Sequence, residues 1–452
     1  MHNLRNNFEG DRLLWHDEAR KLPLIYDFFE AHKAIDVFSI FDFILYGAVL
    51  PPHAPLLGVR QLFPGEMIKN GERTNEYVNL DLTVRPRNIA TMAAEFQKLL
   101  AEYFASFHDT ESAVLLSGGI DSAIIASFLG SRATAFTWGG WGEQSTDVRY
   151  AKETRKTFGL KEHHFVYADY KKDHEGYRKA VEALGIPLLF HNAVPHIRLA
   201  QAAAERGVKS WFMGQNADTV LVSYPAPIII RRLIRLKKIL PINPLHLWKR
   251  KGFLFSTASV VRLFAYFKSS GVFPGPWIKV PHGYFEEKEE IMRRYVPRGT
   301  LMQKIILIEE LLTEARRNQI HQNEIPRLYN IDVRCPYYTR KFIEFALSLP
   351  DGARRKDHYG KAVFKELARL RGVPDVVIEK GKKGLSYGYK EFMARKMHIP
   401  IWDVMEKDDF MNHFLDMRKA RAALQDNFLA FDVLRSLYSW GEWVAKKRGL
   451  KL

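Results

Sequence analysis

Apolar and polar positions follow two alternating patterns from about residue 90 onward. Short apolar runs of strand length are each followed by a longer stretch in which apolar residues recur every three or four positions, as on one face of a helix. Strands that alternate with such helices indicate βαβ units and a parallel sheet. The predicted strands are 113–116, 134–138, 164–167 and 209–213, and the predicted helices are 90–107, 123–129, 147–158, 170–184 and 195–206. The pattern therefore predicts an α/β fold with a parallel sheet flanked by helices.

The two ends of the chain differ from this central region. The first 88 residues are mixed, with a Phe-rich segment at 36–50 that predicts a helix and a turn at 69–72 (KNGE) between two short strands. Beyond residue 225 the pattern is mostly helical. At roughly 100–200 residues per domain, 452 residues suit two or three domains. We predict a small N-terminal part (1–88), an α/β core (89–225) and a helical, basic C-terminal part (226–452).

Cysteine content and hydropathy indicate the cellular compartment of the protein. Cys335 is the one cysteine, so an intramolecular disulfide and a zinc ribbon are excluded. No uncharged run reaches the 18 residues of a membrane-spanning helix, and the first residues lack the apolar core of a secretory signal. These features predict a cytoplasmic protein.

The net charge of +17 is unevenly distributed. Residues 219–285 contain eleven Lys or Arg and no Asp or Glu. Within them, residues 230–240 predict a basic amphipathic helix that carries Arg231, Arg232, Arg235 and Lys238 on one side. Such a surface suits an anionic partner. The candidates are an anionic membrane surface contacted through 228–280, an RNA, and a phosphorylated or nucleotide-linked acid.

The sequence SGGIDS at residues 117–122 joins a predicted strand to a predicted helix. Its two glycines allow a tight turn and the close approach of a ligand. The helix that follows presents backbone N–H groups and its positive dipole end. Hydroxyls of Ser117 and Ser122 can donate to phosphate oxygens, whereas Asp121 would repel a phosphate unless a cation such as Mg²⁺ lay between them. The lack of a GK[ST] sequence distinguishes this phosphate-binding loop from a Walker loop.

This segment resembles the SGGxDS pyrophosphate loop of the N-type ATP pyrophosphatases. Further segments, in the same order, resemble the synthetase domain of class B asparagine synthetases. They are 58–68 (GVRQLFPGEMI), 214–219 (GQNADT), 332–337 (DVRCPY), 360–361 (GK) and 382–385 (KKGL). The resemblance covers about residues 40–390. It implies a PP-loop ATPase fold of the adenine nucleotide alpha-hydrolase type.

The resemblance also implies ATP and Mg²⁺ as cofactors. In the family, a substrate carboxylate attacks the α-phosphorus of ATP, pyrophosphate leaves, and an amine then attacks the acyl-adenylate. Fixed charges in such a site stabilise charge that develops on phosphoryl or acyl oxygens. The implied nucleotide-binding residues are Leu116, Ser117, Gly118, Gly119, Asp121, Ser122, Met213, Gly214 and Asp218. Asp121 and Asp218 would hold the metal, and the implied catalytic residues are Lys382, Lys361, Arg334 and Asp332.

Several positions depart from the family pattern. The family's glutamine-hydrolysing domain uses a cysteine at position 2, where this chain has His2, and 88 residues are too few for that domain. We expect residues 1–88 to be a reduced remnant, and the amine to be ammonia, an amino group of the substrate, or one supplied by a partner protein. Gln215 and Thr219 replace family carboxylates, and a glutamine cannot act as a general base.

The predicted function is an ATP-dependent, glutamine-independent ligase that forms an amide from a carboxylate substrate. The acid would be a sugar acid of a surface polysaccharide, a peptide or another natural-product acid. A tRNA-modifying PP-loop enzyme is one alternative, but its sulfur-transferring members need two cysteines, so nucleic acid is the less favoured partner. An ATP-binding protein with altered catalysis is the other, and Gln215 and Thr219 support it.

Overall fold

The computed structural model describes residues 35–55, 61, 63, 66–69, 72–75, 79–107, 112–140, 142–222, 227–232, 277–311, 320–354, 361–379, 402, 405–407, 412, 415–424 and 431–447. Its centre is a five-stranded sheet of order β5-β4-β3-β6-β7, in which all four neighbouring pairs are parallel. The strands are β3 (Ser112–Leu115), β4 (Ala133–Gly140), β5 (His163–Tyr167), β6 (Ser210–Phe212) and β7 (Asp332–Arg334). The predicted α/β class is therefore confirmed.

The central strand β3 explains why its sequence is a short apolar run. It pairs with β4 and β6, with Val114 opposite Phe212 and Leu115 opposite Phe136. All four of its residues are buried, as expected of a strand covered on both faces. Its only polar member, Ser112, lies 3.2 Å from the hydroxyl of Ser210 on β6.

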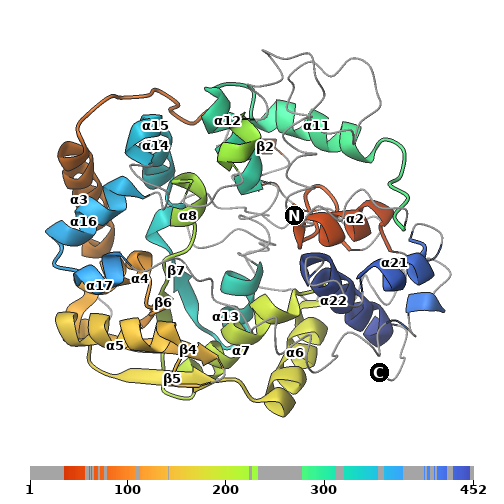
Figure 1. Cartoon of the computed structure of the whole chain (residues 1–452), viewed down its shortest axis with the longest axis horizontal. Helices are drawn as coiled ribbons and strands as arrows, with labels where there is room; N and C mark the ends of the chain where they lie inside the picture. The colour runs from red at the N-terminus through yellow and green to blue at the C-terminus, as the bar shows by residue number, and fades with distance from the viewer. Residues whose placement is uncertain are drawn as a thin grey trace.

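Helices cover both faces of the sheet (Figure 1). On one side lie α3 (Ile89–Ala105), α4 (Ile120–Leu129), α5 (Thr146–Phe158), α16 (Ala362–Leu370) and α17 (Asp375–Ile378). On the other lie α6 (Tyr170–Leu184), α7 (Phe190–Ala204) and α13 (Ile325–Arg327). The sheet thus draws its fifth strand and three of these covering helices, α13, α16 and α17, from the part of the chain beyond residue 225.

The remaining elements surround this core. They are α2 (Val37–Tyr46), β1 (Glu66–Lys69), β2 (Glu72–Asn75), η2 (Gly130–Arg132), α8 (Ala217–Val220), α11 (Tyr284–Tyr295), α12 (Leu301–Glu309), η4 (Ile320–Glu324), η5 (Pro336–Tyr338), α14 (Arg340–Ser348), α15 (Asp351–Arg354), α21 (Met417–Leu424) and α22 (Phe431–Lys447). The predicted hairpin is present, since β1 and β2 are antiparallel with Lys69 opposite Glu72. In the described part of the chain, no helix has the length and apolar character needed to cross a membrane.

Candidate active site

The SGGIDS sequence forms the turn between β3 and α4. Gly118 has a φ of +66°, and a Cβ there would lie 2.6 Å from the carbonyl oxygen of Asp147 at the start of α5. A side chain is therefore excluded by both conformation and space. Gly119 is the N-cap of α4 and has no side chain to cover the first backbone N–H groups, which leaves that end of the helix suited to an anion.

Two serine hydroxyls fix the shape of this turn. The Ser122 hydroxyl donates to the carbonyl of Gly119 at 3.0 Å and accepts from the backbone N–H of Ser117 at 3.2 Å. It also lies 3.2 Å from the Ser117 hydroxyl. Because Ser122 has one hydroxyl proton, Ser117 is the donor in that contact. The hydrogen bonds of Ser122 thus link the first and third residues of the loop, Ser117 and Gly119, to the first turn of α4.

The second motif, which follows β6, packs directly against the first turn of α4. The N–H of Met213 donates to the carbonyl of Arg334 at 3.0 Å and so extends the pairing of β6 with β7. A Cβ on Gly214 would lie 2.9 Å from the Asp121 Cβ and 3.1 Å from the Ser122 nitrogen. Only glycine allows this close approach, which brings Asp218 on α8 to the same edge of the sheet as Asp121.

Lys361 joins the two aspartates. Its ammonium bonds to both carboxylate oxygens of Asp121 and lies 2.7 Å from Oδ1 of Asp218. We call these three residues the site cluster. Burial of Lys361 would lower the pKa of its ammonium, but the two carboxylates outweigh burial and raise that pKa above its ordinary value. The lysine side chain is therefore protonated and positively charged.

The site cluster fits a bound Mg²⁺ in a nucleotide complex. Two carboxylates already converge on one cation, and the side chain of Asp218 is 33% exposed. Among the described residues there is no group of three or more His, Cys, Asp or Glu that could form an all-protein cage. Mg²⁺ commonly uses only one or two carboxylates and takes its other ligands from phosphates and water. Asp121 and Asp218 would hold it.

A chain of hydrogen bonds fixes both motifs to the segment after β7. The Tyr337 hydroxyl donates to the carbonyl of Asp121 at 3.0 Å, and the Asn216 amide donates to the carbonyl of Tyr337 at 3.0 Å. The Cys335 thiol donates to the carbonyl of Gln215 at 3.2 Å. No role was predicted for Asn216, Cys335 or Tyr337, although all three belong to the segments that carried the resemblance.

Comparison with known proteins now identifies the family. A family model described as asparagine synthase matches residues 96–428. The chain belongs to the asparagine synthase family. The matched region includes the five-stranded sheet, the SGGIDS loop and all three residues of the site cluster. Membership supports an ATP-dependent ligase function in general. No match was found among curated proteins.

Two predicted catalytic residues of this asparagine synthase family member lie on β7. The guanidinium of Arg334 lies over the ring of Phe107, 4.2 Å from its centre, and 5.9 Å from the centre of the Phe212 ring. The Asp332 carboxylate is 3.8 Å from the Arg334 Nε. These contacts anchor Arg334 to aromatic side chains beside the sheet. A catalytic role for either residue stays a prediction, and the predicted Lys382 lies outside the described residues.

Gln215, in the second motif, forms an amide pair with Gln322. Nε2 of Gln322 donates to Oε1 of Gln215 at 2.7 Å. Gln322 belongs to a π-helical segment, η4, all five residues of which are buried. Such segments are rare and often lie at functional sites. The contact explains how Gln215 is held, and no sequence motif pointed to Gln322.

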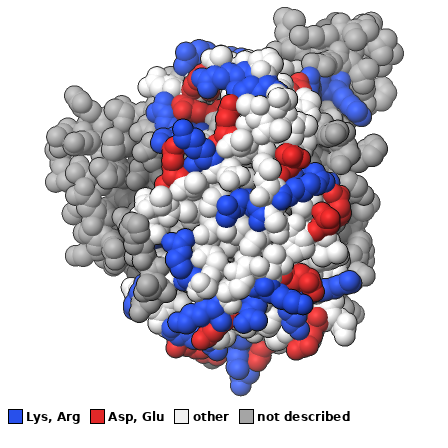
Figure 2. Space-filling view, turned by 90° about the vertical axis from the view of Figure 1, so that its left-hand side faces the viewer, with Lys and Arg blue, Asp and Glu red and all other residues white. Residues whose placement is uncertain are grey.

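The basic segment is only partly described. Of residues 228–280, the structure describes 228–232 and 277–280, so the predicted amphipathic helix and the predicted membrane contact lie mostly outside it. Arg231 forms an ion pair of 2.6 Å with Asp351. The face shown in Figure 2 carries Lys and Arg interspersed with Asp and Glu, without a single-sign patch among its described residues.

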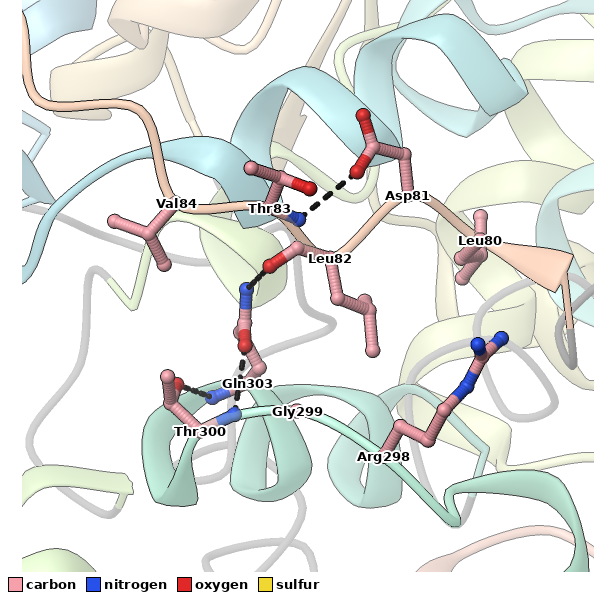
Figure 3. Close-up of a pocket in the computed structure, with 9 residues that line it drawn as sticks. All are labelled: Leu80, Asp81, Leu82, Thr83, Val84, Arg298, Gly299, Thr300 and Gln303. Carbon is pink, nitrogen blue, oxygen red and sulfur yellow. Dashed lines mark hydrogen bonds between the residues drawn. The ribbon is translucent and has the colours of Figure 1, made fainter.

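A surface hollow of about 600 Å³ lies between the segment before α3 and the start of α12 (Figure 3). Gln303 spans it: its Nε2 donates to the carbonyl of Leu82 at 2.8 Å, and its Oε1 accepts from the N–H of Thr300 at 2.7 Å. Thr300 and Gln303 also form the capping box of α12. The hydrogen bonds drawn there lie within and between these two segments, and none of the labelled residues belongs to the site cluster.

Proposed function

We propose that this protein adenylates a carboxylic acid with ATP, releases pyrophosphate and transfers the acyl group to an amine. The observation that carries the proposal is the convergence of Asp121, Asp218 and Lys361 beside the SGGIDS loop at the carboxyl edge of a parallel sheet. Ligands of open parallel sheets bind at this edge. Mg²⁺, when bound, supplies charge neutralisation on the triphosphate.

The chain's own residues would divide the work as follows. The turn at 117–119 and the start of α4 would bind the leaving pyrophosphate through backbone N–H groups. Lys361 would stabilise negative charge that develops on the oxygens of the α-phosphate as the carboxylate attacks it. Gly214 would keep Asp218 close enough to Asp121 for one metal ion to contact both.

We propose that the attacking amine reaches the site unprotonated. Gln215, held by Gln322, can accept or donate a hydrogen bond but cannot remove a proton at neutral pH. We propose ammonia, a substrate amino group or an amine from a partner protein as the acceptor, without glutamine hydrolysis by this chain. The acid substrates proposed are sugar acids of surface polysaccharides and peptide or natural-product acids.

The test is an isotope exchange between pyrophosphate and ATP in the presence of Mg²⁺ and a panel of these acids. The proposal expects exchange that depends on one class of acid, and trapping of the activated acyl group by hydroxylamine as a hydroxamate. If ATP is converted to AMP only when tRNA is added, the tRNA-modifying alternative is correct. If ATP binds and none of these reactions occurs, the chain is a nucleotide-binding protein with altered catalysis.

A further inference from the structure

Lys361 is held in an unusual backbone conformation at the start of α16. Its φ is +59°, in the left-handed region that non-glycine residues rarely adopt. Among the described residues only four non-glycine residues have a positive φ, and Asn216, in the second motif of the same site, is another of them. Backbone strain of this kind persists where the surrounding structure imposes it, and it concentrates at functional sites.

The position of the ammonium is well defined. The side chain is only 9% exposed, and its Nζ contacts both oxygens of Asp121 and one oxygen of Asp218. The ammonium also lies 5.5 Å from the centre of the Phe364 ring on the same helix. The three charged side chains of the site cluster together carry one net negative charge.

The ammonium and a divalent cation would compete for this position. An Mg²⁺ ion that contacted both aspartates at its normal distance of about 2.0–2.1 Å would lie within a few ångströms of Nζ. Two positive centres so close in a largely buried site repel strongly. The arrangement in the structure and an arrangement with Mg²⁺ between Asp121 and Asp218 therefore exclude one another unless Lys361 moves.

We infer that Lys361 is an internal counter-ion that keeps free divalent metal out of the site until a triphosphate arrives. A triphosphate gives the ammonium a new anionic partner, so Lys361 can leave the carboxylates as the metal reaches them. The site would consequently bind the metal–ATP complex and discriminate against the metal alone. This inference rests on the proposed nucleotide site but not on any particular acid or amine.

The test is a titration with Mn²⁺, followed by the electron paramagnetic resonance signal of the free ion, without nucleotide. Lys361→Met should create one Mn²⁺ site about tenfold or more tighter than any in the wild-type protein, because two carboxylates lose their counter-ion. Asp121→Asn in the Lys361→Met background should abolish that gain. The matched control is Lys365→Met. Lys365 lies one turn along α16, and its ammonium pairs with Glu379 at 3.1 Å. This variant should leave Mn²⁺ binding unchanged.

A second measurement covers the case in which Lys361→Met is poorly folded. Mg²⁺ should raise the melting temperature of Lys361→Gln far more than that of wild type or Lys365→Met, since metal binding to the folded state stabilises it. In the wild-type protein, saturating α,β-methylene-ATP should tighten Mn²⁺ binding about tenfold or more.

The inference is overturned if wild-type protein without nucleotide binds Mn²⁺ as tightly as Lys361→Met does, or if neither Lys361 variant gains affinity. The proposed function fails by a different result. If wild-type protein does not bind α,β-methylene-ATP at any Mn²⁺ concentration, the nucleotide site is wrong, while the comparison between Lys361→Met and wild type without nucleotide still decides whether the lysine excludes the metal.

Discussion

Among the described residues, two largely buried clusters bring a lysine together with aspartate, and they differ in the number of carboxylates that contact the lysine. In the interior cluster, Asp42 on α2 accepts from the Tyr284 hydroxyl at 2.8 Å, the Lys288 ammonium at 3.0 Å and the Leu50 N–H at 2.9 Å. One carboxylate faces one ammonium, and both residues are 0% exposed. In the site cluster, two carboxylates share one ammonium and Asp218 reaches the surface.

This difference separates a structural role from a binding role. The interior cluster joins α2 to α11 and has no need of a further charge, so it contributes to the fold alone. The site cluster keeps one net negative charge among its three side chains and lies beside a helix N-terminus. Under the proposed function, it would bind a cation together with an anion, which is the requirement of a metal–triphosphate complex.

The largest effect on stability is expected from breaking the interior cluster. Lys288→Met leaves the Asp42 carboxylate buried beside Tyr284 without its ammonium, and should lower the free energy of unfolding by about 3–5 kcal/mol. Urea denaturation measures this. Lys419→Met is the control, because its ammonium pairs with Asp416 at 2.7 Å on the surface, where about 0–1 kcal/mol is expected. Equal losses in both variants would remove the contrast between the interior cluster and an ordinary ion pair.

In the site cluster the corresponding change should affect function and not folding. Asp121→Asn should reduce acid-dependent AMP release about 10²–10³-fold, because a fixed charge for the metal–triphosphate complex is lost. Unfolding free energy should change little, since Lys361 keeps its 2.7 Å contact with Asp218. The exposed Asp375→Asn is the control for AMP release. Undiminished turnover by Asp121→Asn would show that Asp121 has no part in the reaction.

A pH effect is expected beside the interior cluster. The ring of His53 lies between Asp36 at 3.0 Å and Glu287 at 2.8 Å. Burial alone would lower its pKa, but these hydrogen bonds raise the pKa from 6.5 to about 9. Because the pKa of His53 is higher in the folded state, protonated His53 contributes its full stabilisation below pH 6.5. This contribution is lost as the pH rises toward 9. Unfolding free energy should fall across this window by up to about 3 kcal/mol; in His53→Gln the curve should be flatter, and a curve identical to wild type would contradict this assignment.

Among the changes that should lower stability, the smallest effect is expected when a single methyl group is added between the two motifs. Gly214→Ala places a Cβ 2.9 Å from the Asp121 Cβ, and should lower stability by about 1–3 kcal/mol through overpacking. It should also weaken binding of α,β-methylene-ATP, because Asp218 moves away from Asp121. Gly142→Ala is the control, since no atom lies within 4 Å of the Cβ it would add. Calorimetry that finds the same nucleotide affinity in both variants would show that this close approach is not needed for binding.

Much of the core was predictable because it depends on local pattern. Short apolar runs located the strands β3 to β6, and apolar residues that recur every three or four positions located their helices. The predicted helix 170–184 has the observed bounds of α6. The strand β7 was missed. It has only three residues, Asp332–Arg334, and its two charged members conceal the apolar alternation that marks a strand.

The site was predictable only where a motif marks it. SGGIDS and Asp218 were found from the sequence, but the contact of Lys361 with Asp121 spans 240 positions and no local pattern encodes it. Gln322 was missed for the same reason, since it meets Gln215 across 107 positions. The pairing of Asp42 with Lys288 likewise joins distant segments whose sequences give no sign of each other.

The most direct test of the central claim is a crystal structure of the protein with Mg²⁺ and α,β-methylene-ATP. The account predicts that the phosphates lie against residues 117–122, that one metal ion contacts Asp121 and Asp218, and that the Lys361 ammonium has left Asp121 for the phosphates. Phosphates bound elsewhere on the molecule would contradict the account.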